Sequence, residues 1–485
     1  MTDTTETGRE VPLVVDLDGT LIKTDLLHET ASAYVTSHPL QGFRVLSWLM
    51  QGKAVLKEKL AQTYHIDPHT LPYAPQVLDF ARAEKARGRT IILATASHHS
   101  LADPIAAYLG LFDEVLATDA PVNLKGETKR AALVEKYGEK GFDYIGDTAA
   151  DLVIWQAAHT AHVVGPAADL VARVKGFGNL GMVFDSGRPP SGRTIIKALR
   201  LHQWVKNLLV FVPLMTAHLY TEPFRLLQAG LAFLVFGMTA SSVYLLNDII
   251  DVGHDRHHQR KKKRPFAAGD LSIIYGWQLF PLLLAAAAVI AWVTLPHAFL
   301  VVMAAYFIWT LAYSLGLKQI AMLDVLSLAG LYTVRIIAGG AAVSVSLSFW
   351  LLTFSMFLFL SLAFIKRFSE LQSARLKGAA EQIRGRGYVH EDLEIVSSLG
   401  SSSGYMAVLV LALYIQDGQT AHLYQTPQFI WLACPLLLYW MSRVWIIAHR
   451  GRMHDDPIVF ALKDPVSWAI GALFVVAFAL ARLVG

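Results

Sequence analysis

The distribution of apolar residues divides the chain into two unlike parts. Residues 1 to about 190 mix apolar and polar stretches as a soluble protein does, whereas from Leu208 onward apolar runs of roughly 18 to 22 residues recur. Such runs are long enough to cross a bilayer. We therefore expect an all-α bundle with nine candidate spans, the seventh of them short: 207–220, 226–248, 275–295, 298–316, 321–342, 347–365, 403–416, 427–445 and 465–484.

The N-terminal half has the pattern of a doubly wound α/β sheet. Apolar strands end near Val15, Ala94 and Ile145, with helical stretches between them, which places a site at the carboxyl ends of the strands. The long insert between Thr24 and Arg89 is expected to form a helical cap, about 25–89. Its apolar run FRVLSWLM is expected in the cap core, and docking onto the membrane domain or the bilayer is the alternative.

Composition agrees with this division. The 485 residues exceed one ordinary domain, and 54% hydrophobic with 16% charged residues indicates that part of the chain lies in lipid. The Gly, Pro and Ser residues of SGRPPSGR predict a linker over 186–196, between a domain at 11–185 and a membrane domain at 197–485. The polar tail 1–10 lacks the apolar stretch of a signal peptide. The single cysteine, Cys434, lies in a predicted span and allows no internal disulfide.

The placement of positive charge predicts the orientation in the membrane. With the N-terminus inside, the loops on the cytoplasmic side hold 17 lysines and arginines, against Arg225 in the outer loops. We therefore expect a multi-pass protein of a bacterial-type inner membrane, with its long polar loops and its soluble domain in the cytoplasm. The net charge of +4 is small, and we expect no nucleic-acid partner.

The stretch NDIIDVGHD, residues 247–255, predicts a Mg²⁺ site. Asp248, Asp251 and Asp255 recur every three or four residues and would share one helix face. Oxygen ligands, including the amide of Asn247, suit Mg²⁺, which often completes its shell with substrate phosphates. The alternative is a solvated acidic helix end. The basic run that follows would hold phosphate oxygens or, alternatively, set topology at anionic headgroups: Lys261, Lys262, Lys263 and Arg264.

This motif at the end of the second span resembles the first motif of the UbiA superfamily of intramembrane prenyltransferases, over about residues 195–485. Members of that family have a second aspartate-rich motif for another Mg²⁺. This sequence departs from the pattern, because the corresponding stretch offers Tyr313, Lys318 and a single Asp324, with Leu328 where a second carboxylate would stand.

The departure resembles the branch of decaprenyl-phosphate phosphoribosyltransferases, as do LRLHQWVKNLLVF, RIIAGG and KRFSEL. That resemblance implies phosphoribosyl pyrophosphate and polyprenyl phosphate as substrates. Lys318 would bind the lipid phosphate or else be a snorkelling lysine at a span end. Arg335 lies inside a span and needs a partner, either a phosphate or Asp324. The candidate substrate-binding residues of this half are Lys206, Asn207, Tyr313, Lys318, Arg335, Lys366 and Arg367.

The N-terminal half contains four motifs in the order of the haloacid dehalogenase (HAD) superfamily. They are DLDGT at Asp16 and Asp18, Thr95 in IILATAS, Lys125 in NLKGETK, and Asp147 with Asp151 in DYIGDTAADL. The resemblance implies that Asp16 attacks phosphorus, that Asp18 protonates the leaving oxygen, and that Thr95 and Lys125 hold the phosphoryl group.

Two choices stay open in this half. Lys129 is the rival of Lys125, since the sequence does not say which side chain points inward. The alternative to an active phosphatase is a degenerate HAD fold that serves only as a scaffold. The resemblance implies one Mg²⁺ held by Asp16, the Asp18 carbonyl, Asp147 and Asp151.

Together the motifs predict a bifunctional enzyme that transfers 5-phosphoribose to polyprenyl phosphate and then removes the 5-phosphate. One alternative is a conventional prenyltransferase with an unrelated HAD activity, and another is a lipid-phosphate binding protein. The loop 443–464 would close over phosphoribosyl pyrophosphate or be merely charged, with Arg450, Arg452, Asp455 and Asp456 as its candidates. Whether the chain forms a homo-oligomer stays open.

Overall fold

The computed structural model describes residues 11–64, 66–119, 123–165, 168–185, 191–258, 260–376, 386–416, 424–453 and 456–483. The expected tail 1–10, part of the expected linker, and Asp455 lie outside these residues. The chain packs as two compact units: residues up to Arg200 together with Tyr244–Pro281, and Leu201–Val243 together with Leu282–Gly485. The domain boundary at 186–196 stays a prediction.

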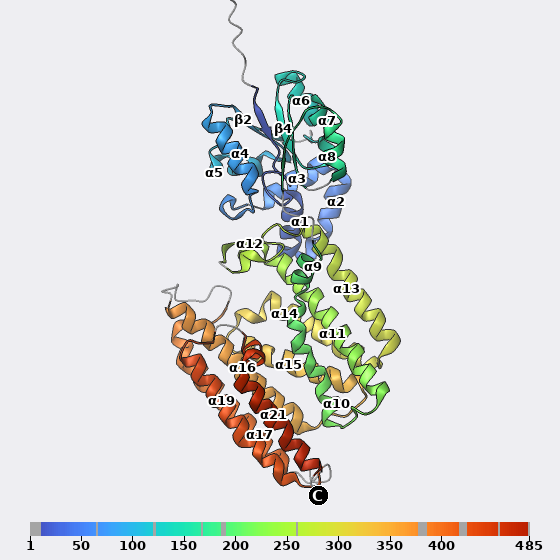
Figure 1. The fold of residues 1–485 in the computed structure, drawn as a ribbon, viewed down its shortest axis with the longest axis vertical. Helices are drawn as coiled ribbons and strands as arrows, with labels where there is room; N and C mark the ends of the chain where they lie inside the picture. The colour runs from blue at the N-terminus through green and yellow to red at the C-terminus, as the bar shows by residue number, and fades with distance from the viewer. Residues whose placement is uncertain are drawn as a thin grey trace, which may run out of the picture. The chain divides into compact units, whose positions relative to one another are not determined.

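The first unit is built on a six-stranded parallel sheet, as the strand pattern predicts (Figure 1). The strand order is β3-β2-β1-β4-β5-β6, so the chain winds outward in both directions from the pair β1 and β4. Ligands of such sheets bind at the carboxyl ends of the strands beside this switch point. The strands are β1 (Leu13–Val15), β2 (Ile91–His98), β3 (Glu114–Thr118), β4 (Asp143–Gly146), β5 (Ala161–Val164) and β6 (Leu180–Phe184).

Helices cover both faces of the sheet because successive strand residues point to opposite sides. Leu13 and Val15 pack with α4 (Pro75–Ala86) and α5 (His99–Leu109) in one apolar cluster. Val14 belongs to another cluster, with α6 (Glu127–Tyr137), α7 (Leu152–Ala157) and α8 (Ala168–Lys175). The short strand β1 is therefore buried on both sides and holds the residues that follow it in place.

A small helical cap with its own core follows β1. It comprises α1 (Leu26–Ser37), α2 (Phe43–Gln51) and α3 (Lys53–Thr63), packed around Tyr34, Leu56 and Leu60. The next helix, α4, returns to the sheet, so the segment expected to form the cap contributes to both layers.

The expectation that FRVLSWLM lies in the cap core is wrong for most of that run. Val45 and Trp48 pack inward, but no residue of α2 is fully buried, and Phe43 and Leu46 are 71% and 62% exposed. The spacing of apolar residues in this run fits a helix, but only one side of that helix packs against the cap core.

The transmembrane part is all helical, as the apolar runs predict. Eight helical segments in the described part of the chain are long and apolar enough to cross a membrane. They centre on α11 (Pro223–Ile250), α13 (Ile273–Thr294), α14 (His297–Leu315), α15 (Leu323–Ala342), α16 (Phe349–Leu376), α17 (Leu393–Gln416), α19 (Ala433–His449) and α21 (Pro465–Leu483).

The expected first span, 207–220, is built differently. It forms the 3₁₀ helix η4 (Leu201–Phe211) and the short α-helix α10 (Val212–Thr216), after α9 (Gly192–Leu199). Pro213 lies at the beginning of α10, and His218 just beyond its end has a positive φ of 59°, so no long helix continues through the segment.

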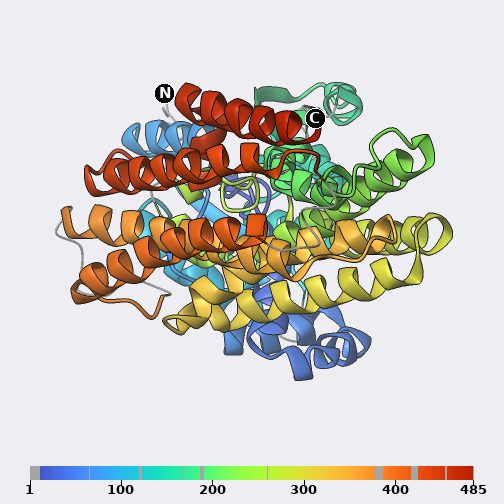
Figure 2. The same cartoon turned by 90° about the horizontal axis from the view of Figure 1, so that it is seen from below.

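In the second unit, α16, α17, α19 and α21 run side by side, drawn from orange to red in Figure 2. A glycine makes the close approach possible: a Cβ atom at Gly400 in α17 would lie 2.3 Å from the Trp445 ring and 2.6 Å from Phe364. Small residues at helix contacts are the usual way in which membrane helices gain van der Waals contact.

A buried ion pair joins the cap to the segment that follows α11. Arg256, in α12 (Val252–His257), donates to both carboxylate oxygens of Glu29 in α1, at 2.9 and 2.5 Å. The two side chains are 5% and 7% exposed. Trp277 adds a second link, because its Nε1 donates to Ser32 Oγ at 3.0 Å. These contacts explain why Tyr244–Pro281 packs with the sheet domain.

Glu29→Gln should destabilise the first unit strongly, because Arg256 would keep its buried charge without a carboxylate. Breaking a buried pair in this way costs roughly 3 to 5 kcal/mol. We expect the midpoint of thermal unfolding to fall by roughly 6 to 12 °C. Intrinsic tryptophan fluorescence measures this midpoint. The matched control is Asp67→Asn, which breaks the exposed Asp67–His257 pair of the same segment and should change the midpoint little. Equal shifts in both variants would refute this ranking.

Candidate functional site

The carboxyl ends of β1 and β4 bring three aspartates together. Asp16 directly follows β1, and its carboxylate has oxygens within 4.8 Å of those of Asp147 and Asp151. Burial, followed by the negative charges of Asp16 and Asp151, raises the pKa of Asp147 well above its ordinary value. Three acidic groups at this spacing match the oxygen ligands of a Mg²⁺ ion, which would relieve their repulsion.

Asp18, two residues beyond Asp16, lies where a second strand and the cap meet. Its Oδ2 accepts from Ser97 Oγ at 2.6 Å and Thr95 Oγ1 at 3.4 Å, and its Oδ1 accepts from the backbone N–H of Leu26 at 2.8 Å. Burial, and then the charge of Asp25, raise the pKa of Asp18 to about 7. A carboxyl group with such a pKa can hold a proton near neutral pH, as a general acid must.

The cap contributes a lysine to this edge of the sheet. Lys57 of α3 donates to the carbonyl oxygen of Ala96 at 2.6 Å and to Asn123 Oδ1 at 2.8 Å. Within the described residues, no carboxylate pairs with Lys57. Both acceptors are neutral. Burial lowers the pKa of Lys57, and the charges of Asp18 and Asp25 act in the opposite direction.

The motif at 247–255 runs from the end of α11 into α12 and meets two arginines. Asp248 pairs with Arg200, and one nitrogen of Arg264 lies 3.1 Å from Asp248 Oδ1 and 2.6 Å from Asp255 Oδ2. Both aspartates are 2% exposed. Arg264 was expected to hold phosphate, and here it lies between two carboxylates, where a cation would otherwise neutralise them.

The rest of the motif is less enclosed. Asp251 is half-buried at the junction of the two helices, and Lys261, Lys262 and Lys263 are exposed. Asn247 Oδ1 is buried and has no hydrogen-bond partner within the described part of the chain. A buried amide oxygen without a donor is a suitable ligand for a hard cation, and so the residues present fit Mg²⁺.

In the second unit, Asp324 is fully buried and neutralised by arginines. Its carboxylate accepts from Tyr313 Oη at 2.8 Å, from Arg386 Nη1 at 2.9 Å, and from two nitrogens of Arg367. Its lone pairs are thus taken by four donor contacts, and Asp324 offers no open position for a second metal ion.

Arg335, in α15, is 5% exposed and does not pair with Asp324, so that alternative is wrong. Its Nε donates to Asn207 Oδ1 at 3.0 Å and its Nη2 to Tyr306 Oη at 3.3 Å. The rings of Phe236, Tyr306 and Tyr332 surround its guanidinium group at 5.2 to 5.5 Å. No carboxylate among the described residues offsets this charge.

Two further lysines converge on the loop before α20 (Pro457–Lys463). Lys206 Nζ lies 2.7 Å from Asp456 Oδ2, and Lys366 Nζ lies 3.6 Å from the same oxygen. Although burial alone would raise it, Lys366 and Lys206 lower the pKa of Asp456 to about 2. A small pocket opens beside this group, lined also by Leu328 and Tyr332. Lys318 lies apart from it in sequence, half-buried in the 3₁₀ helix η6 (Leu317–Gln319).

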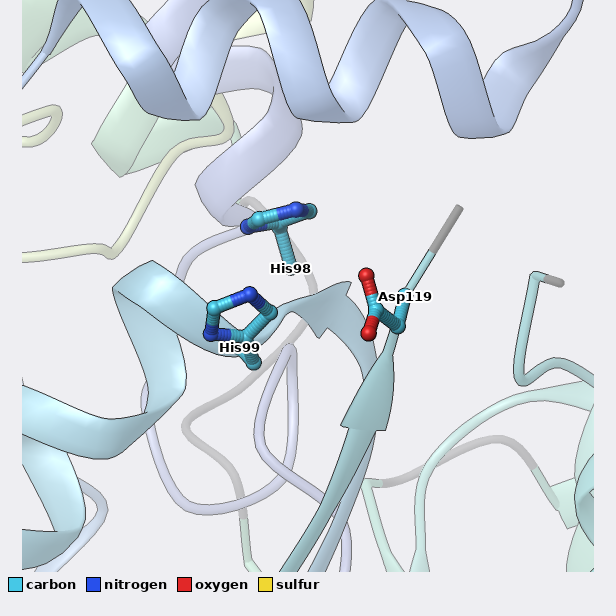
Figure 3. A group of neighbouring side chains, drawn as sticks. All are labelled: His98, His99 and Asp119. Carbon is cyan, nitrogen blue, oxygen red and sulfur yellow. The ribbon is translucent and has the colours of Figure 1, made fainter. Parts of the chain in front are cut away.

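Another group of metal-binding side chains lies at the ends of β2 and β3. His98, His99 and Asp119 have ligand atoms within 4.8 Å of one another. Figure 3 shows the two imidazole rings one above the other, and their centroids are 4.4 Å apart with an angle of 32° between the planes. This spacing would allow the three side chains to hold a metal ion, and His98 is buried whereas His99 and Asp119 are exposed.

Both halves of the chain match known protein families. Residues 208–464 match the UbiA prenyltransferase family, and residues 13–154 match the haloacid dehalogenase-like hydrolases. An uncharacterized protein of Sinorhizobium fredii, y4nM, is 37% identical over 474 residues, which cover 98% of this chain and 91% of the relative. The chain belongs to the UbiA prenyltransferase family.

Its N-terminal half is a HAD domain, as the motif order predicted. Other relatives match only part of the chain. The nodulation protein NoeC of Azorhizobium caulinodans is 37% identical over 276 residues, 56% of this chain and 87% of the relative. A decaprenyl-phosphate phosphoribosyltransferase of Mycolicibacterium smegmatis is 33% identical over 279 residues, again 56% and 87%.

The structure shows which of the two lysines lies beside Asp16. Lys129, in α6, is 3% exposed and donates to Asp16 Oδ1 at 2.9 Å and to Tyr144 Oη at 3.1 Å. Lys125 precedes the helix and is exposed. The contact expected of Lys125 is thus made by Lys129, whose buried side chain reaches Asp16 from α6.

Other residues of these sites were not identified from the sequence: Ser97, Lys57, Arg200 and Arg386. Ser97 is the only one with a local signal, since it follows Thr95 by two positions and so points to the same side of β2. The remaining three come from segments whose partners are distant in the chain.

Lys129→Met should lower the hydrolysis of a small phosphate ester such as p-nitrophenyl phosphate by at least about 100-fold, because the charge beside Asp16 is lost. Lys125→Met, the matched control, should stay within about threefold of the unmodified protein, since that side chain is solvated. Initial rates at saturating Mg²⁺ decide the ranking. A larger loss in Lys125→Met would restore the original assignment.

Proposed function

We propose that the UbiA domain transfers 5-phosphoribose from phosphoribosyl pyrophosphate to polyprenyl phosphate, and that the HAD domain then removes the 5-phosphate to give polyprenyl-phosphoryl-ribose. The proposal places both sites on the cytoplasmic side of a bacterial-type inner membrane. Similarity to the mycobacterial phosphoribosyltransferase over the UbiA half supports it.

The binding of Asp324 by arginines is the main structural support for the proposed transfer reaction. Two arginines and a tyrosine bind this carboxylate and leave none of its lone pairs open. Among the described residues of the UbiA domain, the proposed metal ligands are therefore Asn247, Asp248, Asp251 and Asp255, although Asp248 and Asp255 also pair with Arg200 and Arg264. One such set is sufficient for the diphosphate of phosphoribosyl pyrophosphate. The acceptor is a lipid monophosphate, which cationic side chains can bind without a metal.

The cationic side chains of the second unit are suited to this acceptor. Arg335 is held by neutral partners, so an arriving phosphate would not have to displace a carboxylate. Lys206 and Lys366 share Asp456, and a phosphate could exchange with that carboxylate at the same two ammonium groups. The loop 443–464, whose role was left open, thereby takes part through Asp456.

The chemistry of transfer requires positioning rather than a strong base. The bond between ribose C1 and the diphosphate oxygen breaks, and an oxygen of the lipid phosphate forms the new bond to C1. Bound Mg²⁺ supplies positive charge to the leaving diphosphate. Arg200 and Arg264, which pair with the motif aspartates, lie where they can bind the diphosphate oxygens as charge grows on them.

In the second reaction, Asp16 attacks the 5-phosphate and forms an aspartyl phosphate, while Asp18 gives its proton to the departing ribose oxygen. Water then releases inorganic phosphate from Asp16, and Asp18 takes up the proton. Lys129 is placed beside Asp16 throughout. Lys57 of the cap can bind a second negative charge, and the proposed product has one in its phosphodiester.

Asp248→Asn should abolish transfer of radiolabelled phosphoribose to lipid-extractable product, with a loss of at least about 100-fold. Hydrolysis of a small phosphate ester by the HAD domain should stay nearly intact, because different carboxylates serve it. The matched control is Asp270→Asn, an exposed aspartate of the same segment, with unchanged transfer expected. Full transfer by Asp248→Asn would disprove the assignment. Consumption of a prenyl diphosphate, but not of phosphoribosyl pyrophosphate, would favour the conventional prenyltransferase.

Asp16→Asn tests whether the two domains act in sequence. The substitution removes the nucleophile and keeps the size of the side chain, so transfer should continue while polyprenyl-phosphoryl-phosphoribose accumulates. The unmodified protein should yield mainly the lipid without the 5-phosphate, and mass spectrometry separates the two by one phosphate group. Identical products from both proteins would show that the HAD domain acts on another substrate.

A further inference from the structure

The outer side of α2 is an apolar surface on the cap of the HAD domain. Leu40, Phe43, Leu46 and Met50 are 91%, 71%, 62% and 77% exposed. Phe43, Leu46 and Met50 are spaced by three and four residues and share one face of the helix. The opposite face, with Val45 and Trp48, packs on the cap core. Four large apolar residues at the edge of one small domain are an unusual solvent-facing group.

The charged residues of the chain segment that carries this surface are all basic. Between Thr30 and Lys57 the chain has no aspartate or glutamate, whereas Arg44 lies within the apolar run and Lys53 follows it. Both basic residues are exposed, and no carboxylate among the described residues pairs with them. A surface that offers apolar side chains within a cationic rim matches an anionic membrane interface, which supplies acyl chains and negative headgroups together.

We propose that α2 and Leu40 insert into the headgroup region of an anionic bilayer, and so hold the HAD domain against the membrane. The surface is small, and its affinity as an isolated element would be weak. It does not need to be strong, because the UbiA domain already tethers the chain to the bilayer and the binding is intramolecular. Lys53 and Arg44 would strengthen this binding at a negatively charged surface.

Depth measurements on the full chain test this proposal. In a Cys434→Ser background, which removes the single cysteine, a nitroxide is attached at Leu46→Cys or Met50→Cys. The matched control is Gln51→Cys, which is exposed on another side of the same helix. Each protein is reconstituted, one copy per nanodisc, in phosphatidylcholine alone or with roughly 30% phosphatidylglycerol. Power saturation then compares access of oxygen, which partitions into lipid, with access of a water-soluble nickel chelate.

In the anionic nanodiscs, labels at positions 46 and 50 should be protected from the nickel chelate by about threefold or more relative to position 51. Protection should fall when Arg44 and Lys53 are both replaced by glutamate, and at about 0.5 M salt. Equal nickel access at all three positions would overturn the proposal. Protection that does not depend on lipid charge would also overturn it if labels in multi-copy samples show dipolar coupling. That result would indicate that the apolar surface binds a second copy of the chain. The outcome does not depend on which reactions the two domains catalyse.

Discussion

Asp248 and Asp255 are almost fully buried and share Arg264, while Arg200 completes the neutralisation of Asp248. A buried carboxylate without a partner costs several kcal/mol, and so these residues can only occur together. The same requirement explains Asp324 between Arg367 and Arg386. It explains Asp16 beside Lys129 as well. Arg264 lies nine residues from Asp255, whereas Arg200, Arg367, Arg386 and Lys129 come from segments distant in the chain and so hold two segments in a fixed relation.

This constraint also connects the two candidate sites of the first unit. The first turn of α1 donates the N–H of Leu26 to Asp18 in the HAD site, and one turn later Glu29 binds Arg256, the neighbour of Asp255. A single helical turn of the cap therefore contacts both Asp18 and the segment of the UbiA motif.

Two cationic side chains in this protein are held by neutral hydrogen-bond acceptors and have no carboxylate partner among the described residues. Lys57 in the cap and Arg335 in α15 are held by carbonyl, amide and hydroxyl oxygens. Neutral acceptors satisfy their hydrogen bonds, and no carboxylate among the described residues pairs with either cation directly, which favours an anion from outside the chain. Both proposed reactions use phosphorylated substrates, and these two cations are candidates for binding them.

Local patterns in the sequence determined the classes of structure. The alternation of strands and helices predicted the parallel sheet, and apolar runs predicted the membrane helices, because both depend on the period of neighbouring residues. The order of the HAD motifs placed Asp16, Asp18, Thr95 and Asp147 at one sheet edge for the same reason. Only the tertiary structure decided that Lys129 contacts Asp16, that Arg200 and Arg386 neutralise buried aspartates, and that α2 turns its apolar face outward. Those outcomes depend on which distant segments pack together, and a buried charge takes whichever partner the packing places beside it.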